Sequence, residues 1–346
     1  MTLAKVTLLG RAARVAHIDG ATFFSIVNKA WGGLVGMVSV VLIAKTLSPV
    51  EQGFYYTFSS LLALQVVLEL GFSYVIAQVT AHEFALSEQH ESTSVRKRAF
   101  SRLISVFWLS LKWYGILAIF FAVFCSMSGE IFFHATSSDS PRVWNIPWLL
   151  AVMTFALSIP LIPVYSFLEG CNRVSAVAKA RTIQDVVAYC ALWGMFLLGA
   201  GLYAVPALYL AKVLAGISGL ILTGQGPFLL SILRADVNTS EAISWRKEIF
   251  PFQWKIGLSW LSGYLIFQLI SPALFSAQGP KAAGQAGMTI AIFTGFNALM
   301  SSWVITKSPY FCQLVALGRS QELRAAFRRA ALTSTLISVL GLCTLV

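Results

Sequence analysis

The sequence predicts an all-α polytopic membrane protein with a six-helix N-terminal lobe, an incomplete second lobe and about nine transmembrane helices. Three observations predict it. Hydrophobic residues make up 57% of the chain and charged residues only 11%, whereas about a quarter of a soluble domain is charged. Uncharged stretches of about 20 residues recur, the length that crosses about 30 Å of hydrocarbon. Basic residues gather in alternate loops, a pattern typical of the cytoplasmic side of a membrane.

Nine apolar segments account for the expected spans. In chain order they are residues 21–46, 53–79, 103–128, 144–168, 186–204, 206–224, 252–276, 284–306 and 330–346. Each is predominantly apolar over its whole length, with no regular alternation of polar and apolar residues. This favours helices, because a strand of a membrane barrel alternates polar and apolar residues over about 10 residues.

The spans group into parts along the chain. Residues 21–224 form the expected six-helix lobe, 225–251 a cytoplasmic linker and 252–346 a partial second lobe of three helices. Residues 1–20 form a cytoplasmic N-terminus. Within it, the spacing of residues 3–18 fits either an amphipathic helix on the inner leaflet or a frayed tail.

The basic residues set the expected orientation. With the N-terminus in the cytoplasm, 18 of the 25 Lys and Arg residues fall in inside segments, three in outside segments and four within spans. Cytoplasmic loops of membrane proteins carry this excess. The net charge of +11 therefore reflects membrane orientation, and no nucleic-acid partner is expected.

The last apolar segment begins after Arg329 and stops at Val346, with no polar residues behind it. We expect a chain that ends inside its ninth helix, either through a truncated reading frame or because the sequence is a fragment.

Prolines and glycines interrupt several spans. Pro160 and Pro163 lie in span four and Pro272 in span seven. Proline kinks a helix, and such breaks either line a substrate path in transporters or are fixed kinks filled by packing. Gly32 and Gly36 give span one a face of small residues.

Ionisable residues within spans are costly and usually functional. Lys29, Glu69 and Lys112 each lie eight or nine residues from the inner end of their span, about 12–13 Å deep at 1.5 Å per residue. We expect Lys29 and Glu69 to pair in a cavity, which leaves a lysine for an anionic ligand. The alternatives are a static pair and snorkelling lysines. Lys212, six residues from the outer end of span six, is a further candidate for substrate binding or snorkels outward.

Sequence motifs of enzymes and metal sites are absent. The chain contains no HExxH, GxxxxGK[ST] or GxSxG motif and no clustered His–Cys ligand set. We therefore expect no enzyme activity, no cofactor and no metal. The five cysteines show no CxxC spacing and are expected to be small packing residues; they are Cys125, Cys171, Cys190, Cys312 and Cys343.

Four stretches resemble one family. AKTLSPVEQGFYYTFSSLLALQVVLELGF (44–72) is similar to the first hairpin of bacterial polysaccharide and O-antigen flippases, members of the multidrug/oligosaccharidyl-lipid/polysaccharide exporter superfamily. FLEGCNRVSAVAKARTIQD (167–185) resembles their loop between helices four and five. PFQWKIGLSWLSGYLIFQLISPALF and GPKAAGQAGMTIAIFTGFNALMSSWVITKSPYF, within 251–311, resemble their seventh and eighth helices.

The resemblance implies twelve helices in two lobes around a central cavity, of which this chain lacks helices ten to twelve. It implies a multi-pass protein of the bacterial cytoplasmic membrane that moves an undecaprenyl-pyrophosphate-linked oligosaccharide to the outer leaflet by alternating access, with ion coupling in some members. Lys29 and Glu69 match positions where the family often carries charge. The implied partners are the lipid-linked oligosaccharide, membrane lipids, and the polysaccharide polymerase and chain-length machinery.

We expect Lys29 and Lys112 to contact the pyrophosphate or acidic sugars, and Glu69 to tune Lys29 or to carry a coupling proton. Three alternatives stay open. A multidrug exporter of the same superfamily would favour acidic residues in its cavity. A membrane glycosyltransferase or O-antigen polymerase would be an enzyme. A truncated remnant would have no transport role.

Overall fold

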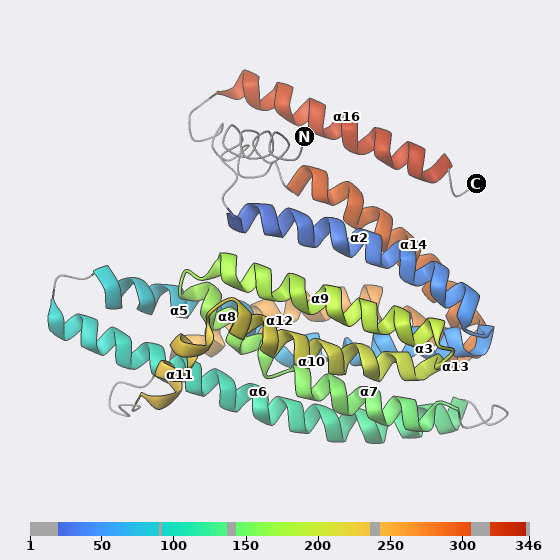
Figure 1. Ribbon diagram of the computed structural model, residues 1–346, viewed down its shortest axis with the longest axis horizontal. Coiled ribbons are helices and arrows are strands. Elements are labelled where there is room, and N and C mark those ends of the chain that lie inside the picture. Colours follow the sequence, from blue (N-terminus) through green and yellow to red (C-terminus); the bar gives the residue numbers. More distant parts are fainter. Residues whose placement is uncertain (1–19, 90–91, 137–142, 236–242, 306–318, 344–346) are drawn as a thin grey trace, which may run out of the picture. The chain divides into compact units, whose positions relative to one another are not determined.

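The computed structural model describes residues 20–89, 92–136, 143–235, 243–305 and 319–343 (Figure 1). Every regular element within these ranges is helical, which confirms the expected all-α fold. The expected amphipathic segment, residues 3–18, lies outside the described residues.

The helices follow one another with short connections. The first eight are α2 (Gly20–Thr46), α3 (Pro49–Leu62), α4 (Gln65–Glu69), α5 (Phe72–Gln89), α6 (Thr93–Thr136), α7 (Asn145–Ser158), α8 (Leu161–Gly170) and α9 (Val174–Leu197). The 3₁₀ turn η1 (Gly201–Tyr203) leads into α10 (Ala204–Leu222), α11 (Gly226–Arg234), the π-helical turn η3 (Trp245–Ile249), α12 (Phe250–Phe267), α13 (Ile270–Gln278), α14 (Pro280–Ile305) and α16 (Ser320–Cys343).

Each expected span overlaps between one and three consecutive helical elements. Among the described residues, four stretches are long and apolar enough to cross a membrane; they are Thr93–Thr136, Asn145–Gly170, Gly201–Leu222 and Gln253–Gln278. A fifth exists if Pro49–Glu69 and Phe72–Glu88, bent by 43°, count as one broken span. A membrane protein of four or five such helices is therefore supported, while nine spans and a cytoplasmic N-terminus stay predictions.

The chain divides into two compact units, one of Met1–Val40 with Thr289–Val346 and one of Val41–Met288. In the first unit α2 and α14 approach closely at small residues. A Cβ added to Gly36 would lie 3.6 Å from the Cα of Gly295. A division of the chain at the expected linker, residues 225–251, stays a prediction.

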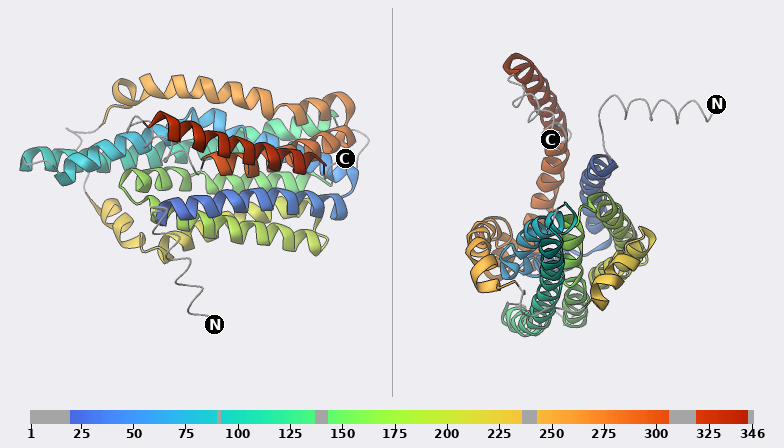
Figure 2. Two further views of the ribbon diagram at one scale, coloured as in Figure 1. Left: turned by 90° about the horizontal axis from the view of Figure 1, so that it is seen from above. Right: turned by 90° about the vertical axis from the view of Figure 1, so that its left-hand side faces the viewer.

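The second unit is a bundle whose helices run side by side (Figure 2). Within it α9 packs along α10, α10 against α7, and α5 against α6 and α8, while α12 and α13 cover α4 and α3. Hydrogen bonds also join these helices; for example, the Tyr264 hydroxyl of α12 donates to the Ser60 carbonyl of α3 at 3.2 Å. Helices from both expected lobes therefore share one core.

Aromatic side chains fill the core where α3, α6, α7 and α13 meet. Phe54, Phe133, Trp144, Trp148 and Phe275 are each at most 1% exposed. Phe133 lies between 5.2 and 5.5 Å, centroid to centroid, from the other four rings. Rings of this size supply large apolar contact areas, so this end of the bundle is tightly packed.

A break separates α4 from α5 in the second expected span. Leu70 and Gly71 both take left-handed backbone conformations, with φ of 53° and 69°. A Cβ on Gly71 would lie 2.2 Å from Cγ2 of Ile256 in α12. Glycine is therefore required at position 71 both by its backbone angle and by the close approach of α12.

Several helices are longer than the apolar segments expected for them. The span expected at 103–128 lies within α6, Thr93–Thr136, and the span expected to begin at residue 186 belongs to α9, which begins at Val174. Charged residues occupy the additional turns, for instance Arg96 in α6 and Arg181 in α9. The apolar stretch marks only part of a helix, because polar residues are equally able to form helical turns.

The expected proline interruptions also lie at helix breaks. Helix α7 ends at Ser158 and Pro160 is the N-cap residue of α8. Pro272 lies in the first turn of α13, just after the break between α12 and α13.

Candidate functional site

A charged pair lies halfway along two packed helices of the second unit. Lys212 is the ninth residue of the 19 in α10, and Asp185 is the twelfth of the 24 in α9. The Lys212 Nζ lies 3.9 Å from the Asp185 Oδ1. The pair therefore lies near the middle of a helix that is long and apolar enough to cross a membrane and of the helix that packs along it.

The pair is partly open rather than enclosed. The Lys212 side chain is 27% exposed and that of Asp185 is 30% exposed. At 3.9 Å the two charges attract each other, but the distance exceeds that of a hydrogen bond. Both groups can therefore exchange their partner for another one.

Tyrosine rings border the lysine. The Lys212 Nζ lies 5.7 Å from the ring centroid of Tyr189 and 5.9 Å from that of Tyr209, within the range of cation–π attraction. The Gln184 side chain donates a hydrogen bond from Nε2 to the Lys212 carbonyl at 2.9 Å, which fixes α9 against α10. These residues form a polar, aromatic surface in an otherwise apolar bundle.

A second ion pair lies one turn before Asp185 on the same face of α9. The Arg181 Nη2 lies 3.2 Å from Oε1 of Glu169 in α8, and its guanidinium carbon lies 5.1 Å from the ring centroid of Tyr165. Residues four apart face the same side of a helix. Charges of alternating sign therefore run from Glu169 through Arg181 and Asp185 to Lys212.

Glu69 occupies a different environment, at the break between α4 and α5. It is 4% exposed. Its Oε2 accepts a hydrogen bond from Gln65 Nε2 at 2.7 Å, and its Oε1 accepts one from the Ser73 backbone N–H at 3.1 Å. The Tyr114 hydroxyl is buried beside it and interacts with the carboxylate electrostatically. Neutral groups thus surround this carboxylate among the described side chains.

Helix α12 is hydrogen-bonded to the same break. Gln253, fully buried, donates from Nε2 to the Glu69 carbonyl at 3.3 Å and accepts at Oε1 from the Trp245 indole N–H at 2.9 Å. The indole of Trp245 stacks on Trp113 of α6, with centroids 5.2 Å apart. The break is therefore a junction of α4, α5, α6 and α12.

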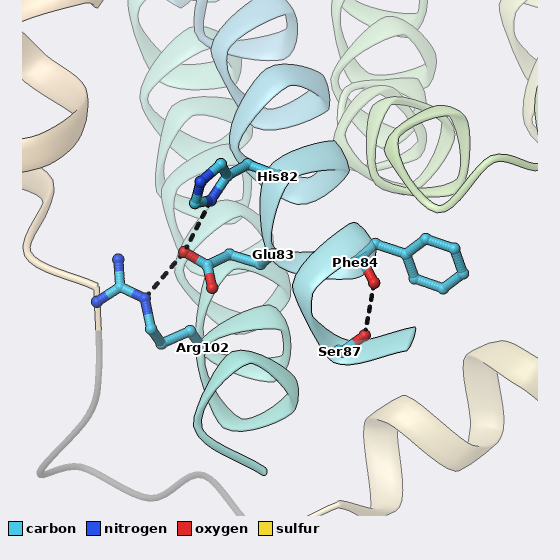
Figure 3. Close-up of polar contacts among 5 residues, drawn as sticks. All are labelled: His82, Glu83, Phe84, Ser87 and Arg102. Carbon is cyan, nitrogen blue, oxygen red and sulfur yellow. Dashed lines mark hydrogen bonds and ion pairs between the residues drawn. The ribbon is translucent and has the colours of Figure 1, made fainter. Parts of the chain in front are cut away.

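A third polar group joins the ends of α5 and α6 (Figure 3). The Arg102 Nε donates to Oε1 of Glu83 at 3.0 Å, and the same oxygen lies 3.6 Å from Nδ1 of His82. The Glu83 side chain is only 6% exposed. The Ser87 hydroxyl donates to the Phe84 carbonyl at 2.8 Å within the last turns of α5. The group clamps the two helices together.

The structure places the four predicted site residues in different surroundings. Lys212 pairs with Asp185, and Glu69 is buried in the junction. Lys29 lies in α2, but its side chain is outside the described ones. Lys112 is exposed, and no ion pair between it and Glu69 occurs in the described part of the chain.

The position of Lys112 on α6 explains its separation from Glu69. It lies on the same face as a row of exposed apolar residues: Ile116, Ile119, Val123 and Met127 are 55% to 69% exposed. Their spacing of four, seven, eleven and fifteen residues from Lys112 is that of one helix face. Tyr114, whose hydroxyl lies beside Glu69, is two residues after Lys112 in α6 and therefore points to a different side of the helix.

Sequence reasoning missed Asp185 and Gln253. The expected span begins at residue 186 and leaves Asp185 just outside it, but α9 begins twelve residues earlier, at Val174. The spacing of Arg181 and Asp185, four residues apart and followed by Tyr189, is the signal that points to a polar face. Gln253 gave no signal, because a single amide in an apolar segment is common.

The surroundings of Cys171 determine the reactivity of its thiol. Cys171 is buried between α8 and α9, where burial raises the pKa of its thiol to about 12, although nearby Arg173 lowers it. A neutral buried thiol is inert. Within the described residues no group of three or more His, Cys, Asp or Glu side chains could hold a metal ion.

Comparison of the chain with protein-family models, with curated proteins and with solved structures finds no match.

Proposed function

We propose that this protein moves an anionic, undecaprenyl-pyrophosphate-linked oligosaccharide from the inner to the outer leaflet of a bacterial cytoplasmic membrane by alternating access. The observation that carries the proposal is the partly exposed pair of Lys212 and Asp185 halfway along α10 and α9, bordered by Tyr189 and Tyr209. The family resemblance of the four sequence stretches points in the same direction.

The physical argument begins with the cost of moving charge. A pyrophosphate cannot cross hydrocarbon unaided, because removing its charges from water is prohibitive. A fixed ammonium group at mid-depth lowers that barrier. A lysine at the centre of a membrane helix costs about 2.5–3.5 kcal/mol; in the resting protein the partial exposure of Lys212 lowers this cost, and the nearby Asp185 lowers it a little further. When the anionic head group arrives, it takes the place of Asp185 as the partner of Lys212.

The tyrosines suit the sugar portion of this substrate. Each combines a flat apolar ring with a hydroxyl that donates and accepts hydrogen bonds. A sugar presents the complementary combination of C–H faces and hydroxyl edges. The polyprenyl tail stays in lipid throughout, so the protein needs a polar surface only for the head group.

The remaining site predictions belong to the same proposal. Lys29 and Lys112 contact the pyrophosphate or acidic sugars, and Glu69 tunes Lys29 or carries a coupling proton. Nine transmembrane helices with a cytoplasmic N-terminus complete this proposed arrangement, with the polysaccharide polymerase and chain-length machinery as partners.

Reconstitution into liposomes tests the function. The substrate is a fluorescent undecaprenyl-pyrophosphate oligosaccharide in the inner leaflet, and its arrival outside is read by an impermeant quencher. Lys212→Gln should abolish transfer at unchanged reconstitution efficiency. Lys255→Gln, which removes an exposed lysine at the start of α12, is the matched control and should retain transfer.

Other outcomes of these assays would contradict the role of Lys212 or favour a different function. Transfer by Lys212→Gln at the wild-type rate removes Lys212 from the path. Efflux of an organic cation without transfer of the oligosaccharide favours a multidrug exporter. A longer glycan product after incubation favours a glycosyltransferase or polymerase, and inactivity of the wild type in all three assays favours a remnant.

A further inference from the structure

A positively charged pocket lies at the end of the bundle where α8 leads into α9 and α10 leads into α11. It has a volume of about 480 Å³ and is lined by Arg173 and Lys179, together with the polar residues Asn172, Ser175 and Thr223. Among the described residues, no acidic side chain lines it. The pocket therefore carries two positive charges and several groups that can form hydrogen bonds.

The pocket lies where lipid headgroups would lie. Two of the candidate membrane stretches end beside it, Asn145–Gly170 and Gly201–Leu222. Asn172 follows the first by two residues, and Thr223 directly follows the second. Basic pockets between helix ends at this level are suited to phosphate-bearing headgroups.

Two neighbouring side chains hold the Arg173 guanidinium in place and leave other N–H groups of the guanidinium available to a ligand. Its Nη1 donates to Oε1 of Gln225 at 2.9 Å, and its guanidinium carbon lies 4.0 Å above the ring centroid of Phe228. Gln225 is itself 5% exposed and donates from Nε2 to the Thr223 carbonyl at 2.8 Å. A guanidinium has five N–H donors in a fixed plane, so this arrangement presents a preoriented cation to the pocket.

The backbone of the loop supports the same geometry. Asn172 has a φ of 59°, a left-handed conformation that asparagine tolerates better than most residues. The adjoining turn after α10 also contains a left-handed residue, Gly224, with a φ of 72°. Both tight turns keep the two loops short, so that Arg173 and Thr223 line one pocket.

We propose that this pocket binds the phosphate group of a lipid headgroup, with Arg173 and Lys179 as the charged contacts. The inference needs only that α8 and α10 cross the bilayer, so it stands independently of the transport proposal. The same chemistry would recognise a phospholipid phosphate or the diphosphate of a polyprenyl lipid, and the experiment distinguishes these sources.

Native mass spectrometry of the delipidated full chain in detergent provides the test. The probes are phosphatidylglycerol, undecaprenyl pyrophosphate, inorganic pyrophosphate and a neutral diglucosyl diacylglycerol. The wild type should bind the two phosphate-bearing lipids and not the neutral glycolipid. Arg173→Gln with Lys179→Gln should weaken that binding by about tenfold for each cation removed.

A matched double variant controls for net charge. Lys97→Gln with Arg98→Gln removes two exposed cations of α6 that lie outside the pocket, and binding should change by less than about twofold. Because Arg173 is partly buried, Lys179→Glu is tested alone; Lys179 is exposed, so this change spares the packing and should still weaken binding about tenfold or more.

The results separate the sources and can overturn the proposal. Competition by inorganic pyrophosphate shows that a diphosphate alone suffices. Binding of phosphatidylglycerol without such competition shows a phospholipid site that needs the lipid anchor. Unchanged binding by the pocket variants, or an equal loss in the Lys97 and Arg98 variant, would refute the pocket as the site.

Discussion

Two polar sites in the same bundle handle charge in opposite ways. Glu69 is 4% exposed, and each of its carboxylate oxygens accepts a hydrogen bond from a neutral group. Lys212 and Asp185 are each about a third exposed, and their charges lie 3.9 Å apart without a hydrogen bond. Ionisable residues within spans can therefore have different roles. The enclosed carboxylate holds helices together, whereas the open pair is able to receive a ligand.

The largest expected effect follows from removing the enclosed carboxylate. Glu69→Leu leaves the Gln65 amide and the Ser73 N–H without their acceptor, and each unsatisfied donor costs about 1–3 kcal/mol. We expect a loss of about 2–6 kcal/mol in the free energy of unfolding, measured by denaturation in mixed micelles. Glu69→Gln keeps one oxygen acceptor and should lose less. A Leu variant as stable as the wild type would show that Glu69 does not hold the junction.

A smaller loss is expected at the partner of this break. Gln253→Leu removes the acceptor of the Trp245 indole N–H and the donor to the Glu69 carbonyl, which should cost about 1–3 kcal/mol by the same measurement. The matched control is Gln278→Leu, at the end of α13 and exposed, which should cost less than about 0.5 kcal/mol. Equal losses in both variants would remove Gln253 from the junction.

For the open pair of Lys212 and Asp185 we expect a small effect on stability and a large effect on function. Lys212→Gln is expected to change the free energy of unfolding by less than about 1 kcal/mol, because partly exposed ion pairs contribute little, while it abolishes oligosaccharide transfer. Unfolding and transfer are measured on the same preparations. A variant that unfolds as readily as Glu69→Leu would erase the contrast between the two sites.

The smallest effect is the coupling between the two charges. A double-mutant cycle with Lys212→Gln and Asp185→Asn isolates their interaction, and we expect about 0.2–1 kcal/mol. Such a value means that an arriving anion can displace Asp185 at low cost. A coupling above about 3 kcal/mol would instead indicate a permanent structural pair.

The sequence allowed part of this arrangement to be predicted. Apolar length identified the helices, and the cost of buried charge singled out Glu69 and Lys212. Depth along a helix, however, does not tell in which direction around the helix axis a side chain points. Lys29, Glu69 and Lys112 share an expected depth, but the direction around the helix axis places Lys112 on an exposed apolar face.

The break at Leu70 and Gly71 shows the same limit for backbone features. No proline marks it, and a lone glycine within an apolar segment is compatible with an unbroken helix. The approach of Ile256 from α12 makes the glycine necessary, and that approach depends on tertiary packing. Asp185 was missed for a related reason, since charged turns hid the first half of α9.

The length of α6 has a mechanical consequence. Its 44 residues make a rod of about 66 Å, roughly twice the hydrocarbon thickness, and the Arg102–Glu83 bond ties α5 to it where the apolar segment begins. A small tilt of the rod among its neighbours would move its N-terminal end, together with the end of α5 bonded to it, through a larger arc. A fluorophore attached at position 98, which is exposed, would therefore report rearrangements deep in the bundle.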